Sequence, residues 1–148
     1  NVINRTDHAQ SGAVMAFRLL DNLNMPADEI CAIISAIGNH DEATAQPINA
    51  ISAALIIADK TDVRRSRVRN ADLMNFDIHD RVNYAVKKSE LFFSKDKTAI
   101  VLELEIDSSI SPVMEYFEIF LQRMLLCKRS AEFLGVKFCL RINGSDII

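Results

Sequence analysis

The sequence predicts an α+β protein whose first half is helical and whose second half is a β-β-α-β unit. Two patterns carry this prediction. Up to Lys60, apolar residues recur every three or four positions, which is typical of helices buried on one face. From Leu102 to Ile106, apolar residues alternate with Glu103 and Glu105, which is typical of a strand with one buried face. We expect the second unit to be a small antiparallel sheet covered by one helix.

Three helices are expected in the first half. The first begins at His8, with Asp7 as its cap. The second follows Pro26, which suits a first helical turn, and ends at Gly38. The third runs from about Asn49 to Lys60 and is apolar on most sides, so we expect it to be central.

The composition changes after the third helix, from a mostly apolar stretch to one rich in arginine. The expected elements are a helix over 81–87, strands over 91–93 and 100–106 joined by a turn at 94–97, a helix that Ser111 caps and Gly135 ends, and a strand over 136–142. We therefore divide the chain into a helical domain over 1–88 and a C-terminal unit over 89–148 that packs on it.

Composition narrows the class of protein. The 148 residues carry a formal net charge of −3, which argues against a general nucleic-acid binder. No apolar run approaches the roughly 20 residues that a membrane span requires. The three cysteines lie in apolar surroundings without CxxC spacing, which indicates reduced, buried thiols in a cytoplasmic protein.

Asp59 and the scarce histidines are the candidates for chemistry. Asp59 directly follows an apolar stretch, and carboxylates are rarely buried unless they are paired or bind a metal. A salt bridge to Arg64 or Arg65, or exposure to solvent, would also explain Asp59. His8 also fits a helix cap or a surface position. His40 follows a helix end beside two acidic residues, where a loop role and a functional role are both open.

The order of three short segments resembles the HD superfamily of metal-dependent phosphohydrolases. The segments are Asn4–Ala13, which contains His8, Gly38–Glu42, which contains His40, and Ala58–Asp62, which contains Asp59. In that family a His and a His-Asp doublet come first, later histidines follow, and a last Asp comes after an apolar helix. The chain is most similar to an uncharacterised bacterial subgroup, and the resemblance covers essentially its whole length. It implies a helical HD-type core for the first domain.

The resemblance implies a divalent-metal site that hydrolyses a phosphate ester, with a nucleotide as one option. Asp59 would be a metal ligand and the catalytic carboxylate, while His8 and His40 would be ligands of a second metal. Imidazole and carboxylate groups suit Mn²⁺, Fe²⁺, Co²⁺ or Ni²⁺, and carboxylates also suit Mg²⁺. The substrate would be a small phosphorylated molecule.

The first His and the His-Asp doublet of the family have no counterpart at the expected place. His40-Asp41 belongs to the later-histidine motif, and His79-Asp80 follows Asp59, which is the wrong order. We therefore expect the chain to begin just after the doublet, with an incomplete metal site and an N-terminally incomplete core.

An arginine-rich run follows Asp59. Guanidinium groups bind phosphate bidentately, so Arg64 or Arg65 is a candidate phosphate clamp, and Lys60 is a further candidate. The alternative is a solvated basic loop. In that case the arginines would pair with Asp72, Asp77 or Asp80.

The helix from Pro112 carries a wide apolar stripe between Tyr116 and Leu126. This stripe predicts either packing on the helical domain or a homodimer contact. The competing function is therefore a non-catalytic, dimeric module that binds a phosphate-bearing ligand. A membrane partner is not expected.

Overall fold

The computed structural model describes residues 6–68 and 75–147, which form five α-helices and one four-stranded sheet. The helices are α1 (His8–Asn22), α2 (Ala27–Gly38), α3 (Ala50–Lys60), α4 (Ile78–Ala85) and α5 (Val113–Phe133). The strands are β1 (Val86–Phe93), β2 (Ala99–Ile106), β3 (Lys137–Ile142) and β4 (Ser145–Asp146). A short 3-10 helix spans Arg65–Arg67. The prediction of a mixed α+β fold is confirmed.

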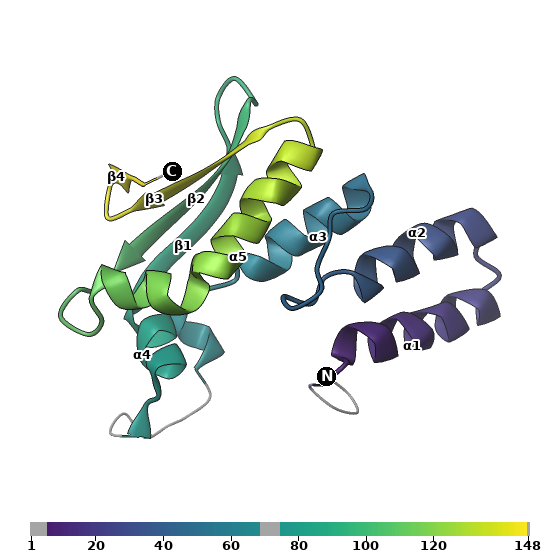
Figure 1. Ribbon diagram of the computed structural model, residues 1–148, viewed down its shortest axis with the longest axis horizontal. Coiled ribbons are helices and arrows are strands. Elements are labelled where there is room, and N and C mark those ends of the chain that lie inside the picture. Colours follow the sequence, from purple (N-terminus) through teal and green to yellow (C-terminus); the bar gives the residue numbers. More distant parts are fainter. Residues whose placement is uncertain (1–5, 69–74, 148) are drawn as a thin grey trace.

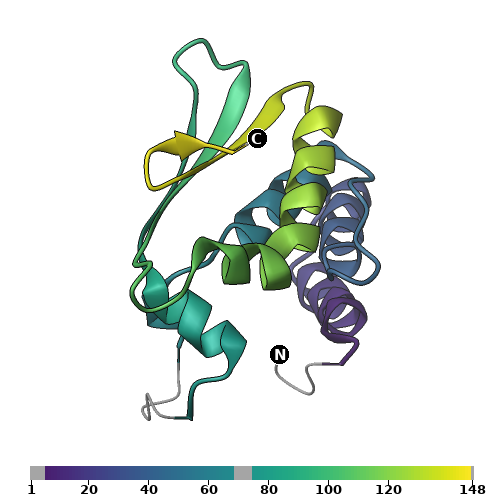
Figure 2. The same ribbon diagram turned by 60° about the vertical axis from the view of Figure 1, so that its left-hand side comes forward.

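The helices are arranged in a row that leads away from the sheet. α5 lies across one face of the sheet, α3 packs on α5, α2 packs on α3, and α1 packs on α2 (Figure 1). α4 lies near one end of the sheet, where the chain enters β1 (Figure 2). The third helix of the sequence is thus central, as predicted, because it joins the helical hairpin of α1 and α2 to the rest of the molecule.

The main core lies between α5 and the sheet. Tyr116, Phe120 and Met124 on α5 are fully buried against Leu102 of β2 and Leu140 of β3. A smaller cluster joins Ala45 and Ile56 to Leu126, on the side of α5 that faces α3. The apolar stripe of this helix is wide because one part of it packs on the sheet and another part packs on α3.

The sheet is mixed, which corrects the prediction of an antiparallel sheet. Its order is β1-β2-β3-β4, with β1 antiparallel to β2 and β3 antiparallel to β4, but β2 and β3 run parallel. The cause is α5, whose 21 residues return the chain to the end of the sheet where β2 began. A strand that follows such a crossover runs in the same direction as the strand before it.

The first strand begins earlier than predicted. The polar stretch from Val86 to Glu90 belongs to β1, and α4 ends at Ala85 rather than at 87. β1 is an outer strand, so most of its residues are exposed and no apolar alternation marks them. A bulge between Val86 and Lys88 further interrupts the pattern.

Two of the predicted helix caps are wrong. Asp7 has a left-handed backbone (φ 54°) and its side chain makes no capping hydrogen bond, since a capping residue needs an extended backbone. Ser111 donates its hydroxyl hydrogen to Glu115, and Pro112 takes the capping position. A reciprocal capping box instead starts α3, between Asn49 and Ser52.

The cysteines differ from one another in burial. Cys127 on α5 is buried, Cys139 on β3 is half-buried, and Cys31 on α2 is exposed. The prediction that all three are buried is therefore wrong for Cys31, which lies on a side of α2 that neither α1 nor α3 covers. Within residues 6–68 and 75–147, every helix is too short or too polar to cross a bilayer.

Candidate metal centre

The structure brings His8 and His40 together at the open end of the helical hairpin, where α1 begins and α2 ends. His8 is the first residue of α1, and His40 follows the end of α2. Their Nε2 atoms lie 3.1 Å apart, and the two rings meet edge to face with centroids 5.0 Å apart. The two imidazoles that the sequence separates by 32 positions thus converge on one point.

Close packing of α1 on α2 permits this approach. Gly12 of α1 faces Ile37 of α2, and a β-carbon at position 12 would lie 3.3 Å from the Ile37 Cγ2 atom. That distance is shorter than ordinary van der Waals contact between carbon atoms, about 3.5–4.0 Å. Glycine at this position therefore lets the two helices pack closely enough for their histidines to meet.

The backbone fixes the orientation of the His40 ring. Its Nδ1 atom lies 2.5 Å from the Ile37 carbonyl oxygen, which can only accept a hydrogen bond. Nδ1 therefore carries the hydrogen, and Nε2 of the neutral ring presents a lone pair toward His8. A hydrogen bond of this kind, from the outer ring nitrogen to a carbonyl, is the usual support of a metal-binding histidine.

The spacing of the two nitrogens fits a shared metal ion. Imidazole nitrogens bound at about 2.0–2.1 Å and separated by angles of about 90–110° lie roughly 2.8–3.4 Å apart. The observed 3.1 Å falls within this range. Asp41 adds a negative charge, with its Oδ1 atom 4.0 Å from Nδ1 of His8. The separation of 3.1 Å is also that of a hydrogen bond between the two rings.

Asp59 lies at the end of α3, and its side chain is 42% exposed. Partial burial alone raises the pKa of this carboxyl. The hydrogen bond from Lys60, together with the positive charges of Lys60 and Arg67, outweighs that effect, so the pKa lies below its ordinary value. Asp59 is therefore ionised at neutral pH.

Lys60 is the direct partner of Asp59. The Nζ atom lies 2.7 Å from the Asp59 Oδ2 atom, and the Lys60 side chain is only 7% exposed. The sequence left solvent exposure and a salt bridge as alternative explanations of Asp59. Asp59 has both partial exposure and an ion pair, but the partner in that pair is Lys60 rather than Arg64 or Arg65. Among the residues that the structure describes, no group of three or more His, Cys, Asp or Glu side chains is arranged to hold a metal ion.

The candidate phosphate-binding residues have different surroundings. Lys60 faces Asp59, and Arg65 donates to the Tyr84 carbonyl oxygen and stacks on its ring at 4.3 Å. Arg64 pairs with Asp62 at 2.8 Å and has a largely exposed side chain. Arg67 also pairs with Asp62. Arg64 and Arg65 are both exposed, and Asp72, one predicted partner of the arginines, lies outside the described residues.

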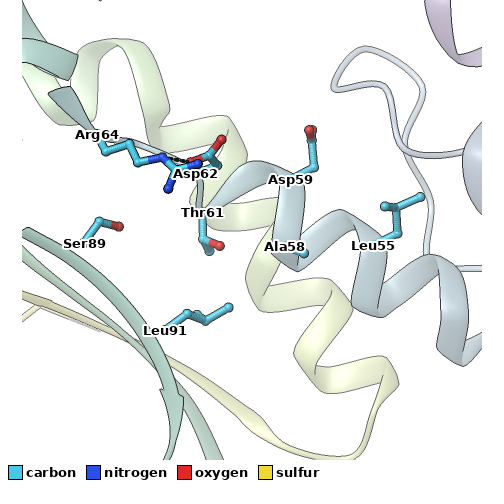
Figure 3. A pocket seen from close by; sticks show the side chains of 8 residues that line it. All are labelled: Leu55, Ala58, Asp59, Thr61, Asp62, Arg64, Ser89 and Leu91. Carbon is cyan, nitrogen blue, oxygen red and sulfur yellow. Dashed lines mark ion pairs between the residues drawn. The ribbon is translucent and has the colours of Figure 1, made fainter. Parts of the chain in front are cut away.

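Arg64 lines an open pocket of about 540 Å³ beside the end of α3. Its walls are residues of α3 and the segment after it on one side and two residues of β1 on the other: Leu55, Ala58, Asp59, Thr61, Asp62, Arg64, Ser89 and Leu91 (Figure 3). Figure 3 shows the Asp59 carboxylate pointing away from Ser89 and Leu91. The pocket is therefore polar where α3 ends and apolar where it meets β1.

Comparison with known proteins identifies no relative of this chain. No family model, curated protein or solved structure matches this chain.

One contact near the site was not predicted. The Nε atom of Arg123, on α5, donates to Glu42 at 2.8 Å, and the guanidinium lies 4.6 Å from the centre of the Phe120 ring. This contact ties the turn that carries His40 to the C-terminal unit, 81 residues later in the chain. Nothing local in the sequence indicates it, because only the packing of α3 on α5 brings Arg123 to that turn.

Proposed function

We propose that His8, His40 and Asp59 belong to the divalent-metal site of an HD-type phosphohydrolase that acts on a phosphate ester. The observation that supports the proposal most directly is the pair of Nε2 atoms at 3.1 Å, with His40 held by a backbone carbonyl. A bound divalent metal would supply positive charge for the phosphoryl oxygens and would acidify a water molecule.

The side chains around the pair have distinct roles in this proposal. His8 and His40 hold the metal through Nε2. Asp59 contributes a carboxylate that Lys60 keeps ionised, and Lys60 itself serves as a counter-ion rather than as a substrate contact. Arg64, held in place by Asp62, orients the substrate phosphate at the mouth of the pocket.

A second candidate is a module that binds a phosphate-bearing ligand without turnover. It is favoured by the small number of ligands, since the described residues bring together two imidazoles rather than a set of three or more donors. The two candidates differ in whether a phosphate ester is cleaved.

Metal binding is the first test. We expect isothermal titration with Mn²⁺ or Co²⁺ to show binding by the native chain. His8→Ala and His40→Ala should each weaken it at least about tenfold, because each removes one of few ligands. His79→Ala is the matched control, since His79 is exposed and contacts the Phe120 ring instead. Binding that all three variants retain equally would refute the metal site.

Turnover is the second test. With Mn²⁺ present, hydrolysis of p-nitrophenyl phosphate by the native chain, reduced at least about tenfold in Asp59→Asn, would support the phosphohydrolase. Metal binding without hydrolysis would instead support the binding module.

A further inference from the structure

The free edge of β1 is an open interaction surface. β1 is the first strand in the sheet order and pairs on one side only, with β2. Among residues 6–68 and 75–147, no backbone group of residues 87–92 hydrogen-bonds to any element other than β2. An unpaired strand edge of this kind is a template for another strand.

The two faces of β1 differ in character. Leu91 and Phe93 are paired with Leu102 and Ile100 of β2, so they belong to the face of the sheet that the helices cover. Both are nevertheless exposed, at 42% and 60%. Lys88 and Glu90 lie on the opposite face, where they form an ion pair of 2.9 Å. An added strand would thus meet apolar side chains on one face, and the charge pair together with Phe92 on the other.

α3 overhangs the edge of the strand and completes the surface. An apolar groove of about 220 Å³ runs between the two elements and continues the polar pocket, with which it shares Ala58 and Leu91. Ala54 and Ala58 line it from α3, and both are exposed. Figure 3 shows Ala58 and Leu55 across the gap from Leu91 and Ser89. The groove is thus bounded by α3 on one side and by the open edge of β1 on the other.

We infer that a second copy of this chain pairs its own β1 with this edge, antiparallel, about a two-fold axis at Ser89. In such a pair, residues on either side of the axis face each other across the two strands. Lys88 then faces Glu90 of the second copy, and Glu90 faces Lys88 of that copy. The dimer would therefore contain two ion pairs between the copies, both formed by the Lys-Ser-Glu stretch. A two-fold interface requires a surface that is complementary to itself, and this stretch meets that requirement.

Neighbouring registers lack this complementarity. An axis at Lys88 or at Glu90 sets two like charges directly opposite each other, which is destabilising. An axis at Leu91 sets the Glu90 carboxylate against the Phe92 ring. Ser89 is small and tolerates an axis position. This interface differs from the contact expected through α5, whose stripe is largely buried within one chain.

Exchange of the two charges tests this register. Lys88→Glu places glutamate opposite Glu90 of the second copy, and Glu90→Lys places lysine opposite Lys88. We expect sedimentation of the native chain over a concentration series to show a dimer. Each single variant should dimerise at least about tenfold more weakly, because two cross-strand pairs become repulsive. Lys128→Glu, an exposed reversal on α5, is the control and should leave the dimer unchanged.

Restoration of the charges makes the test decisive. The double variant K88E/E90K should dimerise like the native chain, and a mixture of the two single variants should form a heterodimer. Circular dichroism identifies any variant that fails to fold, and the mixture stays informative because each chain is restored by the other. A native chain that remains monomeric, or single variants that dimerise as well as the native chain, would overturn the proposal.

Discussion

The α1–α2 hairpin and the unit formed by α5 and the sheet bury their apolar side chains very differently. Tyr116 and Phe120 of α5 are at most 1% exposed. By contrast, Val14 and Leu19 of α1 and Leu23, which directly follows it, are between 62% and 73% exposed. Because burial of apolar area is the main source of folding free energy, the hairpin is the less stable of the two regions.

This difference bears on the candidate metal site. His8 and His40 both belong to the hairpin, whereas Asp59 is at the end of α3, which packs on the core helix α5. A ligand that binds the folded hairpin stabilises it by mass action. Metal binding at the proposed site would therefore stabilise the hairpin, the less well packed of the two regions.

Thiol labelling should give the largest contrast between the regions. Cys31 of α2 is exposed and should react with an alkylating reagent in the native state, while Cys127 of α5 should react only after global unfolding. We expect a rate ratio above about a thousandfold, read by mass spectrometry. Similar labelling rates for the two thiols would contradict a fully folded α5 core.

The same labelling has a defined pH dependence. Burial raises the pKa of Cys127 to about 12, from an ordinary 9.0. The neutral thiol therefore favours the folded state, and this contribution is complete below pH 9. It is lost as the pH rises from 9 toward about 12, because the unfolded thiol ionises first. Protection of Cys127 should decrease in that window.

Truncation of one phenylalanine in each region should give the next largest effect. Phe120→Ala removes a ring that is 1% exposed, whereas Phe17→Ala removes one that is 48% exposed. We expect urea denaturation to show a loss of about 3–5 kcal/mol in the free energy of unfolding for the first. The second should lose less than about 1 kcal/mol. Equal losses would mean that α1 is as well packed as α5.

The contact between Glu42 and Arg123 should give the smallest effect. A double-mutant cycle with Glu42→Gln and Arg123→Gln should yield a coupling of about 0.2–1 kcal/mol, as expected for a partly exposed ion pair. Hydrogen exchange should report faster opening of α1 and α2 in either variant, with the amides of α5 unchanged. Faster exchange throughout α5 would instead show that the contact serves the core and not the hairpin.

The sequence by itself determined the local elements of this protein. Helical periodicity located α3 within one residue, and the alternation around Glu103 located β2, because both patterns arise from neighbours along the chain. The order of His8, His40 and Asp59 also raised the metal hypothesis. The caps at Asp7 and Ser111 were mispredicted, because residue type alone does not fix the backbone conformation on which a cap depends.

Tertiary structure decided how distant segments meet. The parallel pairing of β2 with β3, the 3.1 Å approach of His8 to His40, and the contact of Arg123 with Glu42 join residues that lie far apart in the chain. The stacking of Arg65 on Tyr84 and the position of Arg64 beside the pocket likewise come from the tertiary structure. Such contacts depend on which surfaces are buried against each other, and burial is a property of the whole fold rather than of any local pattern.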